Sequence, residues 1–245
     1  MTVPDDPTPA DTRGTADGAR AQLAALAARG VAWPSLPPVL GLPRPAAVLV
    51  LFGVLDARPA VHPSAAVPAD LDLLLVGRAA SLAHHPGQVA FPGGRLDDGD
   101  AGPAAAALRE AVEETGLDAT GVEVLGTLAE LPVHVSNHVV VPVLAWWATP
   151  SPVAVVDHQE SATVFRAPVA DLVDPANRRT AMLPARITAG RRRAARPDAG
   201  PAFLVPHATG THVVWGFTAL VLDRLLTELG WSEPWDASRT FEVPL

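Results

Sequence analysis

The sequence predicts a mixed α/β fold in which a sheet lies between helices. Apolar runs that contain β-branched residues recur along the chain, and their length is typical of buried strands. One helical pattern falls near the middle, at 103–116, and another near the end, at 217–231. Strands interrupted by helices in this order, without an internal repeat, indicate a layered α/β sandwich. Since 49% of the residues are hydrophobic, the chain can bury a substantial core.

The chain divides into four predicted regions. Residues 1–17 are mostly Pro, Asp, Thr and Gly, have little to bury and are expected to be disordered. Residues 18–45 are expected to form a helix, which Gly30 ends, followed by a proline-rich connection. The main domain is expected over 46–231 and a C-terminal tail over 232–245.

Strands are expected in the main domain wherever an apolar run with β-branched residues lies between turn signals. The segment 190–200 is instead rich in arginine and is expected to be a basic loop. The expected strands cover 46–56, 71–79, 88–91, 122–131, 138–148, 201–206 and 212–216, and 162–174 is expected to hold a strand followed by a short helical turn.

The central helix carries recognisable signals at both of its ends. Pro103 suits the first turn, and Gly116 suits the position at which a helix stops. Asp100 lies just ahead of the helix, either as a cap or as an anion near its N-terminus. Spacing of i, i+3, i+4 and i+7 predicts that one face of this helix is formed by Leu108, Ala111, Val112 and Thr115.

Composition excludes several kinds of chemistry. Without cysteine the chain has neither disulfides nor thiolate–zinc sites, so a metal would be held by oxygen or imidazole. All 18 basic residues are arginine, which excludes lysine chemistry. The net charge of −8 argues against nucleic-acid binding, and no apolar run approaches the roughly 20 residues of a membrane-spanning helix. The acidic start lacks the apolar segment of a signal peptide, so we expect a cytoplasmic protein.

The stretch REAVEETG, at 109–116, concentrates charge in a chain that is otherwise poor in it. Glu110, Glu113 and Glu114 stand at i, i+3 and i+4 of the predicted helix, so their carboxylates share one side. Arg109 can pair with Glu113 but cannot neutralise three carboxylates, and Mg²⁺ or Mn²⁺ would fit this deficit. The alternative is a solvated helix face, on which such a pair contributes only about 0.3–0.5 kcal/mol.

The preceding turn favours the metal site. FPGG at 91–94, followed by REAVEETG, resembles the Nudix box, whose pattern is G-x5-E-x7-R-E-h-x-E-E-x-G-h with h apolar. Counted from Gly94, the sequence departs from this pattern twice, with Asp100 in place of glutamate and with one additional residue before Arg109. The resemblance implies a Nudix-type α/β/α sandwich, with a mixed sheet between helices, that hydrolyses a diphosphate with the help of Mg²⁺ or Mn²⁺.

A longer resemblance extends upstream of the box. The segment 77–94, GRAASLAHHPGQVAFPGG, is similar to the signature of the coenzyme A pyrophosphatase branch, L-L-x-x-R-[SA]-x-x-L-R-x-H-x-G-Q-[VI]-A-F-P-G-G. Ala83 stands where this signature has its second arginine. The resemblance implies hydrolysis of coenzyme A or acyl-coenzyme A to 3′,5′-ADP and (acyl-)4′-phosphopantetheine. The matching positions are Leu74, Leu75, Arg78, Ala79, Leu82, His85, Gly87, Gln88, Val89, Ala90, Phe91, Pro92, Gly93 and Gly94.

The resemblance also implies which residues hold the metal. The carbonyl of Gly93 and the carboxylates of Glu110, Glu113 and Glu114 would bind Mg²⁺ or Mn²⁺, and Arg109 would orient the glutamates. A bound metal lowers the pKa of a water molecule and neutralises the charge that develops at phosphorus.

Catalytic roles are implied for Arg109, Glu110, Glu114 and a further carboxylate outside the box. That carboxylate would act as a metal ligand or general base. Glu160, which precedes a late strand, is the favoured choice, and Glu130 is the alternative.

Substrate contacts are implied for residues of the upstream signature, namely Arg78, His85, Gln88, Phe91 and Gly94. Arg78, His85 and Gln88 would contact the diphosphate or the 3′-phosphate of coenzyme A, and purely structural roles are the alternative for each. The histidines at 84, 134 and 138 lack the regular spacing of a zinc site, and we interpret them as loop or strand residues.

Two other functions stay open. The first is a Nudix pyrophosphatase of another specificity, acting on ADP-ribose, NADH, a dinucleoside polyphosphate or a nucleoside triphosphate, and Ala83 is the reason to keep it. The second is a non-catalytic Nudix module that binds a ligand, against which the three retained glutamates argue. The expected partner is a small nucleoside diphosphate derivative rather than nucleic acid or a membrane, and a homodimer is one arrangement that stays open.

Overall fold

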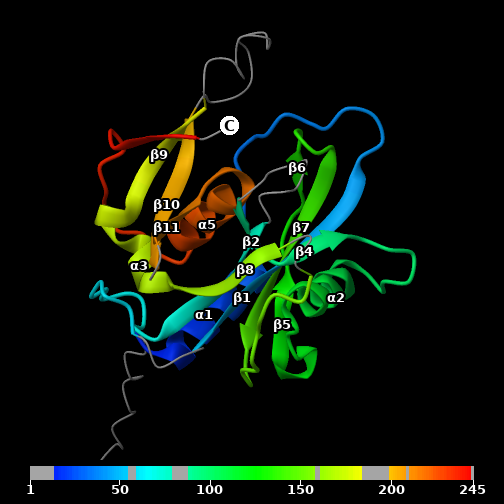
Figure 1. Cartoon of the computed structure of the whole chain (residues 1–245), viewed down its shortest axis with the longest axis horizontal. Helices are drawn as coiled ribbons and strands as arrows, with labels where there is room; N and C mark the ends of the chain where they lie inside the picture. Colours follow the sequence, from blue (N-terminus) through cyan, green and yellow to red (C-terminus); the bar gives the residue numbers. More distant parts are fainter. Residues whose placement is uncertain are drawn as a thin grey trace, which may run out of the picture.

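The computed structural model shows a layered α/β architecture (Figure 1). It describes residues 14–54, 59–78, 88–157, 161–183, 199–207 and 210–243. The helices are α1 (Ala16–Arg29), α2 (Pro103–Thr115), α3 (Val169–Val173) and α5 (Gly216–Glu228), with short 3-10 turns η1 (Ala119–Gly121) and η2 (Pro175–Asn177). The strands are β1 (Arg44–Val54), β2 (Leu71–Arg78), β3 (Val89–Ala90), β4 (Gly93–Arg95), β5 (Val122–Thr127), β6 (Leu131–Val133), β7 (His138–Trp147), β8 (Ser161–Pro168), β9 (Arg178–Met182), β10 (Ala199–His207), β11 (Gly210–Val214) and β12 (Thr240–Glu242).

An eight-stranded sheet forms the middle layer. Its order is β3-β2-β1-β7-β5, and β4 pairs with β1, β6 with β7 and β8 with β2. β1 and β7 run parallel, from Arg44 opposite His138 to Phe52 opposite Trp146. The other pairs of this sheet are antiparallel. The sheet is therefore mixed, as the sequence predicted.

Helices cover both faces of this sheet because its central strands are apolar on both sides. On one face, the alanines of α2 pack against alternate residues of β1, which lets the helix lie close to the strand. On the other face, leucines of α1 and α5 pack against the intervening residues of β1 and against β2. The first contact joins Ala106, Ala107 and Ala111 to Ala47, Leu49 and Leu51, and the second joins Leu23, Leu26, Leu222 and Leu225 to Val50, Phe52, Leu73 and Leu75. The predicted α/β/α sandwich is thus confirmed.

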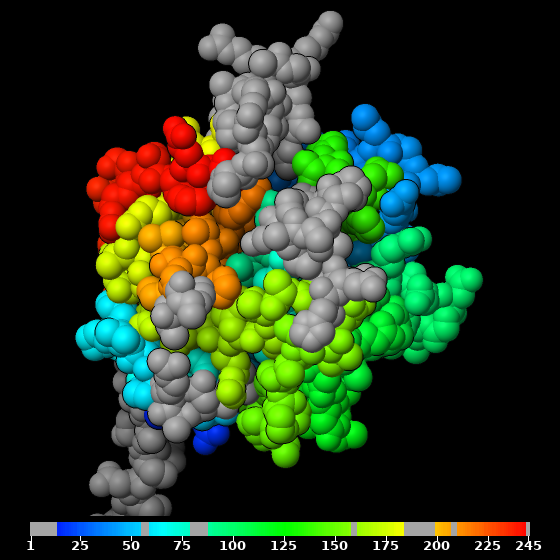
Figure 2. Space-filling view, viewed as in Figure 1, coloured from blue at the N-terminus to red at the C-terminus, as the bar shows by residue number. Residues whose placement is uncertain are grey.

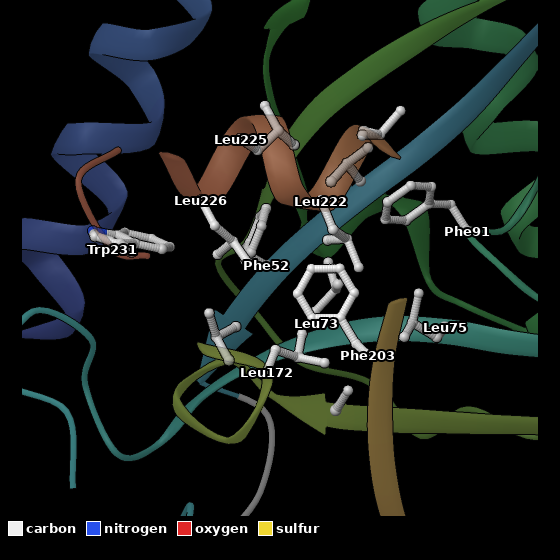
Figure 3. Close-up of a cluster of buried hydrophobic side chains, with 14 of the residues drawn as sticks. Phe52, Leu73, Leu75, Phe91, Leu172, Phe203, Leu222, Leu225, Leu226 and Trp231 are labelled. Atoms are coloured by element: carbon white, nitrogen blue, oxygen red, sulfur yellow. The ribbon is translucent and has the colours of Figure 1, made fainter. Parts of the chain in front are cut away.

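A second, four-stranded sheet lies beside the first, in the order β11-β10-β9-β12. Phe203 of β10 belongs to the same buried cluster as Phe52, Leu73 and Leu222, and Figure 3 shows these side chains together beneath α5. β12 pairs in parallel with β9, so part of the predicted C-terminal tail is a strand of this sheet. Both sheets are therefore built around one apolar cluster.

The predicted elements correspond closely to the observed ones, with a few differences. The N-terminal helix begins after Thr15, whose Oγ1 accepts a hydrogen bond from the Gly18 N–H at 3.1 Å, and it ends at Gly30, where φ is 77°. The strand predicted over 122–131 is shorter, because β5 ends at Thr127 and the chain then turns into β6. β4, β6, β9 and β12 were not predicted, since each is held by pairing with distant residues rather than by an apolar run of its own. Most of the predicted basic loop lies outside the described residues.

In the described part of the chain, no helix has both the length and the hydropathy to cross a membrane.

Candidate active site

Two glycines bring strand β4 against helix α2. Gly93 has φ 153°, and a Cβ there would overlap the backbone of Ala47 and Val48 on β1. A Cβ at Gly94 would instead overlap the carboxylate of Glu110. Only glycine therefore permits both the close strand pairing and the present place of this carboxylate.

Helix α2 presents its acidic residues toward this glycine strand. Pro103 is its first residue, and it ends where Gly116 adopts φ 69° and donates its N–H to the carbonyl of Val112. Glu114 is buried, with 5% of its surface exposed, and its Oε2 accepts a hydrogen bond from the Gly93 N–H at 3.1 Å. A buried carboxylate needs such a partner, so this bond fixes Glu114 at the strand.

The predicted helix face was only partly right. Ala111 and Thr115 are buried as expected, whereas Val112 is 38% exposed. The buried side of the helix is formed by Ala106, Ala107, Ala111, Glu114 and Thr115. The small alanines make the close contact with β1. The predicted face was shifted toward Val112 because the prediction weighted residues by hydrophobicity, and valine is more hydrophobic than alanine.

Arg109 connects the acidic residues to the loop that precedes the helix. Its Nη1 donates to Glu110 at 3.1 Å and to Glu113 at 3.2 Å. Its Nε and Nη2 donate to the two carboxylate oxygens of Asp100 at 3.1 and 3.0 Å, and Nη2 also donates to the carbonyl of Arg95 at 2.9 Å. A planar guanidinium provides these several donors in fixed directions, so Arg109 positions both the helix carboxylates and the loop.

This network changes the acidity of its members. The hydrogen bond from Arg109 holds the pKa of Asp100 below its ordinary value, and a backbone hydrogen bond from Asp97 adds to the effect. The same hydrogen bond with Asp100 raises the pKa of Arg109, so this guanidinium stays charged. Asp100 does not cap the helix, because the N-cap residue is Gly102. Its observed role is that of the anion which holds Arg109.

A polar pocket of about 330 Å³ lies over these residues. Asp157 was not among the predicted site residues. It is brought there by the segment after β7, in which the Ala154 and Val156 N–H groups donate to the carbonyls of Thr115 and Glu114 at 3.0 and 3.2 Å. In the sequence, the feature that could have indicated Asp157 was its position in the segment DHQE, three residues before the predicted Glu160. The pocket is lined by Asp97, Arg109, Glu110, Glu113, Glu114 and Asp157.

The chemistry of this lining fits a hard divalent cation. The pocket has several carboxylates and one guanidinium, so negative charge is in excess, and its donors are oxygens, as Mg²⁺ and Mn²⁺ require. Within the described ranges, no three Asp, Glu, His or Cys side chains are already gathered as a metal site. Glu110 and Glu113 are instead drawn to Arg109, and Glu114 to Gly93.

The other predicted site residues occupy varied positions. Arg78 ends β2, and its N–H donates to the carbonyl of Gln88 at 2.9 Å. Phe91 is 2% exposed and packs in the core near Leu75 and Leu222 (Figure 3). Glu130 is exposed on the connection between β5 and β6. The predicted His85 and Glu160 lie outside the described residues.

The structure is an α/β/α sandwich in which an acidic helix packs on a glycine-containing strand. Comparison with known families identifies the class of protein to which this arrangement belongs. The family model for the NUDIX domain matches residues 62–184, half of the chain. The chain therefore belongs to the Nudix family.

Relatives of known sequence carry the same family name. The chain is 44% identical over 99 residues to the uncharacterized Nudix hydrolase NudL of Cronobacter sakazakii. This match covers 40% of this chain and 50% of the relative. The NudL protein of Escherichia coli K12 is also 44% identical, over 98 residues. The chain spans about half the length of these curated relatives.

Solved structures show more distant similarity. A Nudix hydrolase from Alicyclobacillus acidocaldarius is 17% identical with a TM-score of 0.42, and the match covers 77% of this chain and 93% of that one. The Nudix hydrolase RenU from M. Smegmatis is 28% identical with a TM-score of 0.37, over 50% of this chain and 69% of that one. These similarities are too distant to bear on substrate.

Proposed function

We propose that this chain is a metal-dependent pyrophosphatase that hydrolyses the diphosphate of coenzyme A or acyl-coenzyme A. The products would be 3′,5′-ADP and (acyl-)4′-phosphopantetheine. The observation that supports hydrolysis is the pocket in which Arg109 and several carboxylates face the glycine strand. The observation that supports coenzyme A is the sequence GQVAFPGG with the residues upstream of it.

The metal ligands in this proposal are the carbonyl of Gly93 and the carboxylates of Glu110, Glu113 and Glu114. Bound Mg²⁺ or Mn²⁺ would lower the pKa of a water molecule and neutralise charge on the diphosphate. Arg109 holds Glu110 and Glu113 beside each other, so that repulsion between them does not spread them apart.

Two candidates for the general base follow from the sequence and the structure. Glu160 is the predicted one, and Asp157, three residues earlier, lines the pocket. Either carboxylate would accept a proton from the attacking water, and the other would help to neutralise metal charge. Asp157→Asn and Glu160→Gln, measured separately, distinguish them, because only loss of the base removes the acidic limb of the pH–rate profile.

A second specificity has an observation in its favour. Ala83 removes a cation that the coenzyme A signature places before the diphosphate, so another nucleoside diphosphate derivative could be the better substrate. The three glutamates of the box are all present, and this argues against a module that binds without turnover.

Purified protein with Mg²⁺ or Mn²⁺ should cleave coenzyme A, and product analysis should show 3′,5′-ADP. The same assay with acyl-coenzyme A, ADP-ribose, NADH and nucleoside triphosphates ranks the substrates. If coenzyme A stays intact while another of these is cleaved, the substrate proposal fails and the second specificity replaces it. If none is cleaved, the hydrolase proposal itself fails.

Glu114→Gln tests the metal site. We expect at least about a hundredfold loss of kcat, because a buried ligand is lost where charge develops. Mn²⁺ binding, followed by calorimetry, should weaken in the same variant. Glu242→Gln, on the exposed strand β12, makes the same chemical change outside the pocket and should leave both quantities unchanged. Unchanged turnover and unchanged Mn²⁺ binding in Glu114→Gln would contradict the metal assignment.

A further inference from the structure

Two arginines and a histidine lie on one face of the first sheet, at the end where β1 and β7 begin. Arg44 of β1 stands opposite His138 of β7, and Arg95 of β4 stands opposite Ala46 of β1. β4 and β7 flank β1 on its two sides, so the three residues occupy adjacent places in neighbouring strands.

The pleat of the sheet puts all three on the same side. Paired residues in adjacent strands point to the same face, and residues two apart along one strand do so as well. Arg44 and Ala46 therefore share a face, together with their partners His138 and Arg95. Ala46, the residue between them, has only a methyl group, which leaves the space above it to the longer side chains.

The charge of this group is not compensated locally. Arg44 and Arg95 are exposed, and neither side chain forms an ion pair with a carboxylate in the part of the chain that the structure describes. Burial, and then the two guanidiniums, lower the pKa of His138, so the three groups lie close enough to repel one another. A chain with net charge −8 carries here a surface that favours anions.

This group adjoins the candidate active site through Arg95. The carbonyl of Arg95 accepts a hydrogen bond from Arg109 Nη2 at 2.9 Å, while the preceding residue, Gly94, lies against Glu110. Figure 2 shows the segment that leads into β1 (blue) on the outer surface, next to the hairpin of β6 and β7 (green). Gly94 faces Glu110 and α2, whereas Arg95, the next residue, points to the opposite face of β4. An anion held by the Arg95 side chain would therefore lie across this edge strand from a diphosphate bound at the carboxylates.

We propose that Arg44, Arg95 and His138 form an anion subsite that binds a phosphomonoester group of the diphosphate substrate. Two guanidiniums provide paired donors that match phosphate oxygens, and the imidazole adds a further donor. For coenzyme A the group bound is the 3′-phosphate. The subsite supplies cations in a chain whose upstream signature has Ala83 in place of an arginine. This inference rests on the proposed hydrolysis of a nucleoside diphosphate derivative.

Coenzyme A and dephospho-coenzyme A test the subsite, because they differ only in the 3′-phosphate. In the wild-type protein kcat/KM should be higher for coenzyme A. Arg44→Gln and Arg95→Gln should each lower this preference by about tenfold, which is the order that one charge-assisted hydrogen bond contributes, with little effect on dephospho-coenzyme A. Arg29→Gln, an equal change of charge on the exposed surface of α1, should leave the preference unchanged.

The possible failures are distinguishable. If both compounds are cleaved and the arginine variants leave their ratio unchanged, the subsite is wrong while the proposed hydrolase activity stands. If neither is cleaved, the proposed function fails, and binding still tests the subsite. Calorimetry should then show about tenfold tighter binding of adenosine 3′,5′-bisphosphate than of AMP, reduced by Arg95→Gln. Equal affinities for the two nucleotides would overturn the subsite.

Discussion

Gly93 and Gly94 are adjacent, but each is required for a different reason. At Gly93 the backbone itself leaves no room for a side chain, and its positive φ is strained for any other residue. At Gly94 the obstacle is the end of a flexible side chain, the carboxylate of Glu110. The first glycine thus supports the fold, and the second supports the placement of a proposed metal ligand.

Alanine at these two positions should separate stability from activity. Gly94→Ala should change the free energy of unfolding by less than about 1 kcal/mol, because Glu110 can swing away, but kcat should fall at least about tenfold since Glu110 is displaced. Gly93→Ala should cost about 2 kcal/mol or more, because the backbone of β1 cannot move aside. Urea unfolding and steady-state kinetics measure both quantities. Equal loss of stability in the two variants would contradict this assignment.

Asp100 gives the network around Arg109 a predictable dependence on pH. Its pKa is lower in the folded protein than in the unfolded chain because Arg109 donates to it. A depressed carboxyl pKa stabilises the fold above the unfolded pKa, and this stabilisation disappears as the pH falls through the folded pKa. Asp100→Asn should therefore be less stable than the wild-type protein at about pH 7, with the difference narrowing toward about pH 3. Urea unfolding at both values measures it, and a difference independent of pH would exclude the ionised carboxylate as its cause.

Helix α1 packs more closely on the main domain than the sequence predicted. The sequence predicted it as part of a region preceding the main domain, yet Leu23 and Leu26 are fully buried in the cluster that contains Phe52. Arg20 also forms a bidentate ion pair with the carboxylate of Glu123 on β5, with N–O distances of 2.6 to 2.9 Å. We propose that α1 belongs to the folding unit of the Nudix domain.

Leu26→Ala tests the contribution of α1. Removing this buried side chain should lower the free energy of unfolding by about 2–5 kcal/mol, because the cavity cannot fully collapse. Leu40→Ala is the matched control, since Leu40 is 81% exposed and its loss should cost less than about 0.5 kcal/mol. Equal unfolding midpoints for the two variants in urea would show that α1 is an appendage.

The elements that the sequence predicted are those whose own residues determine them. Apolar runs such as the one in β1 are buried whichever strand lies beside them, and Pro103 and Gly116 mark a helix by their backbone preferences alone. β4 and β9 could not be predicted in this way, because GGR and RRTAM have no strand pattern and are extended only through pairing. The i, i+3, i+4 spacing predicted that the three box glutamates share one side of α2, and all three line the pocket. Asp157 was missed because its place depends on backbone hydrogen bonds to the end of α2.

At the scale of the whole molecule, a buried apolar cluster and a buried arginine connect the two sheets. Arg178 of β9 is 1% exposed, its guanidinium lies over the rings of Phe203 and Trp235, and it pairs with Asp223 of α5. This ion pair connects β9 of the second sheet to α5, the helix that packs on the first sheet. We expect the two sheets to unfold together rather than as separate domains.

Asp223→Asn should weaken the contact between the two sheets, but the molecule should still unfold as one unit. The buried guanidinium loses a charged partner, which should cost about 1–3 kcal/mol. Differential scanning calorimetry should show a single transition in both proteins, with a lower Tm in the variant, by roughly 2–4 °C for each kcal/mol. Asp70→Asn makes the same change at an exposed position and should leave the Tm in place. Two resolved transitions would contradict the shared core.

In the proposed assignment, the metal ligands around β4 and α2 and most of the anion subsite come from different parts of the chain. The glycine pair, Arg109 and the box glutamates all come from one short continuous segment, 93–114, held by hydrogen bonds among its own residues. Arg44 and His138, two of the three residues of the proposed anion subsite, come from other segments, and Arg95 is the third. Under the proposed assignment, mutations at Arg44 and His138 would change which diphosphate derivative is preferred while the metal ligands stay in place.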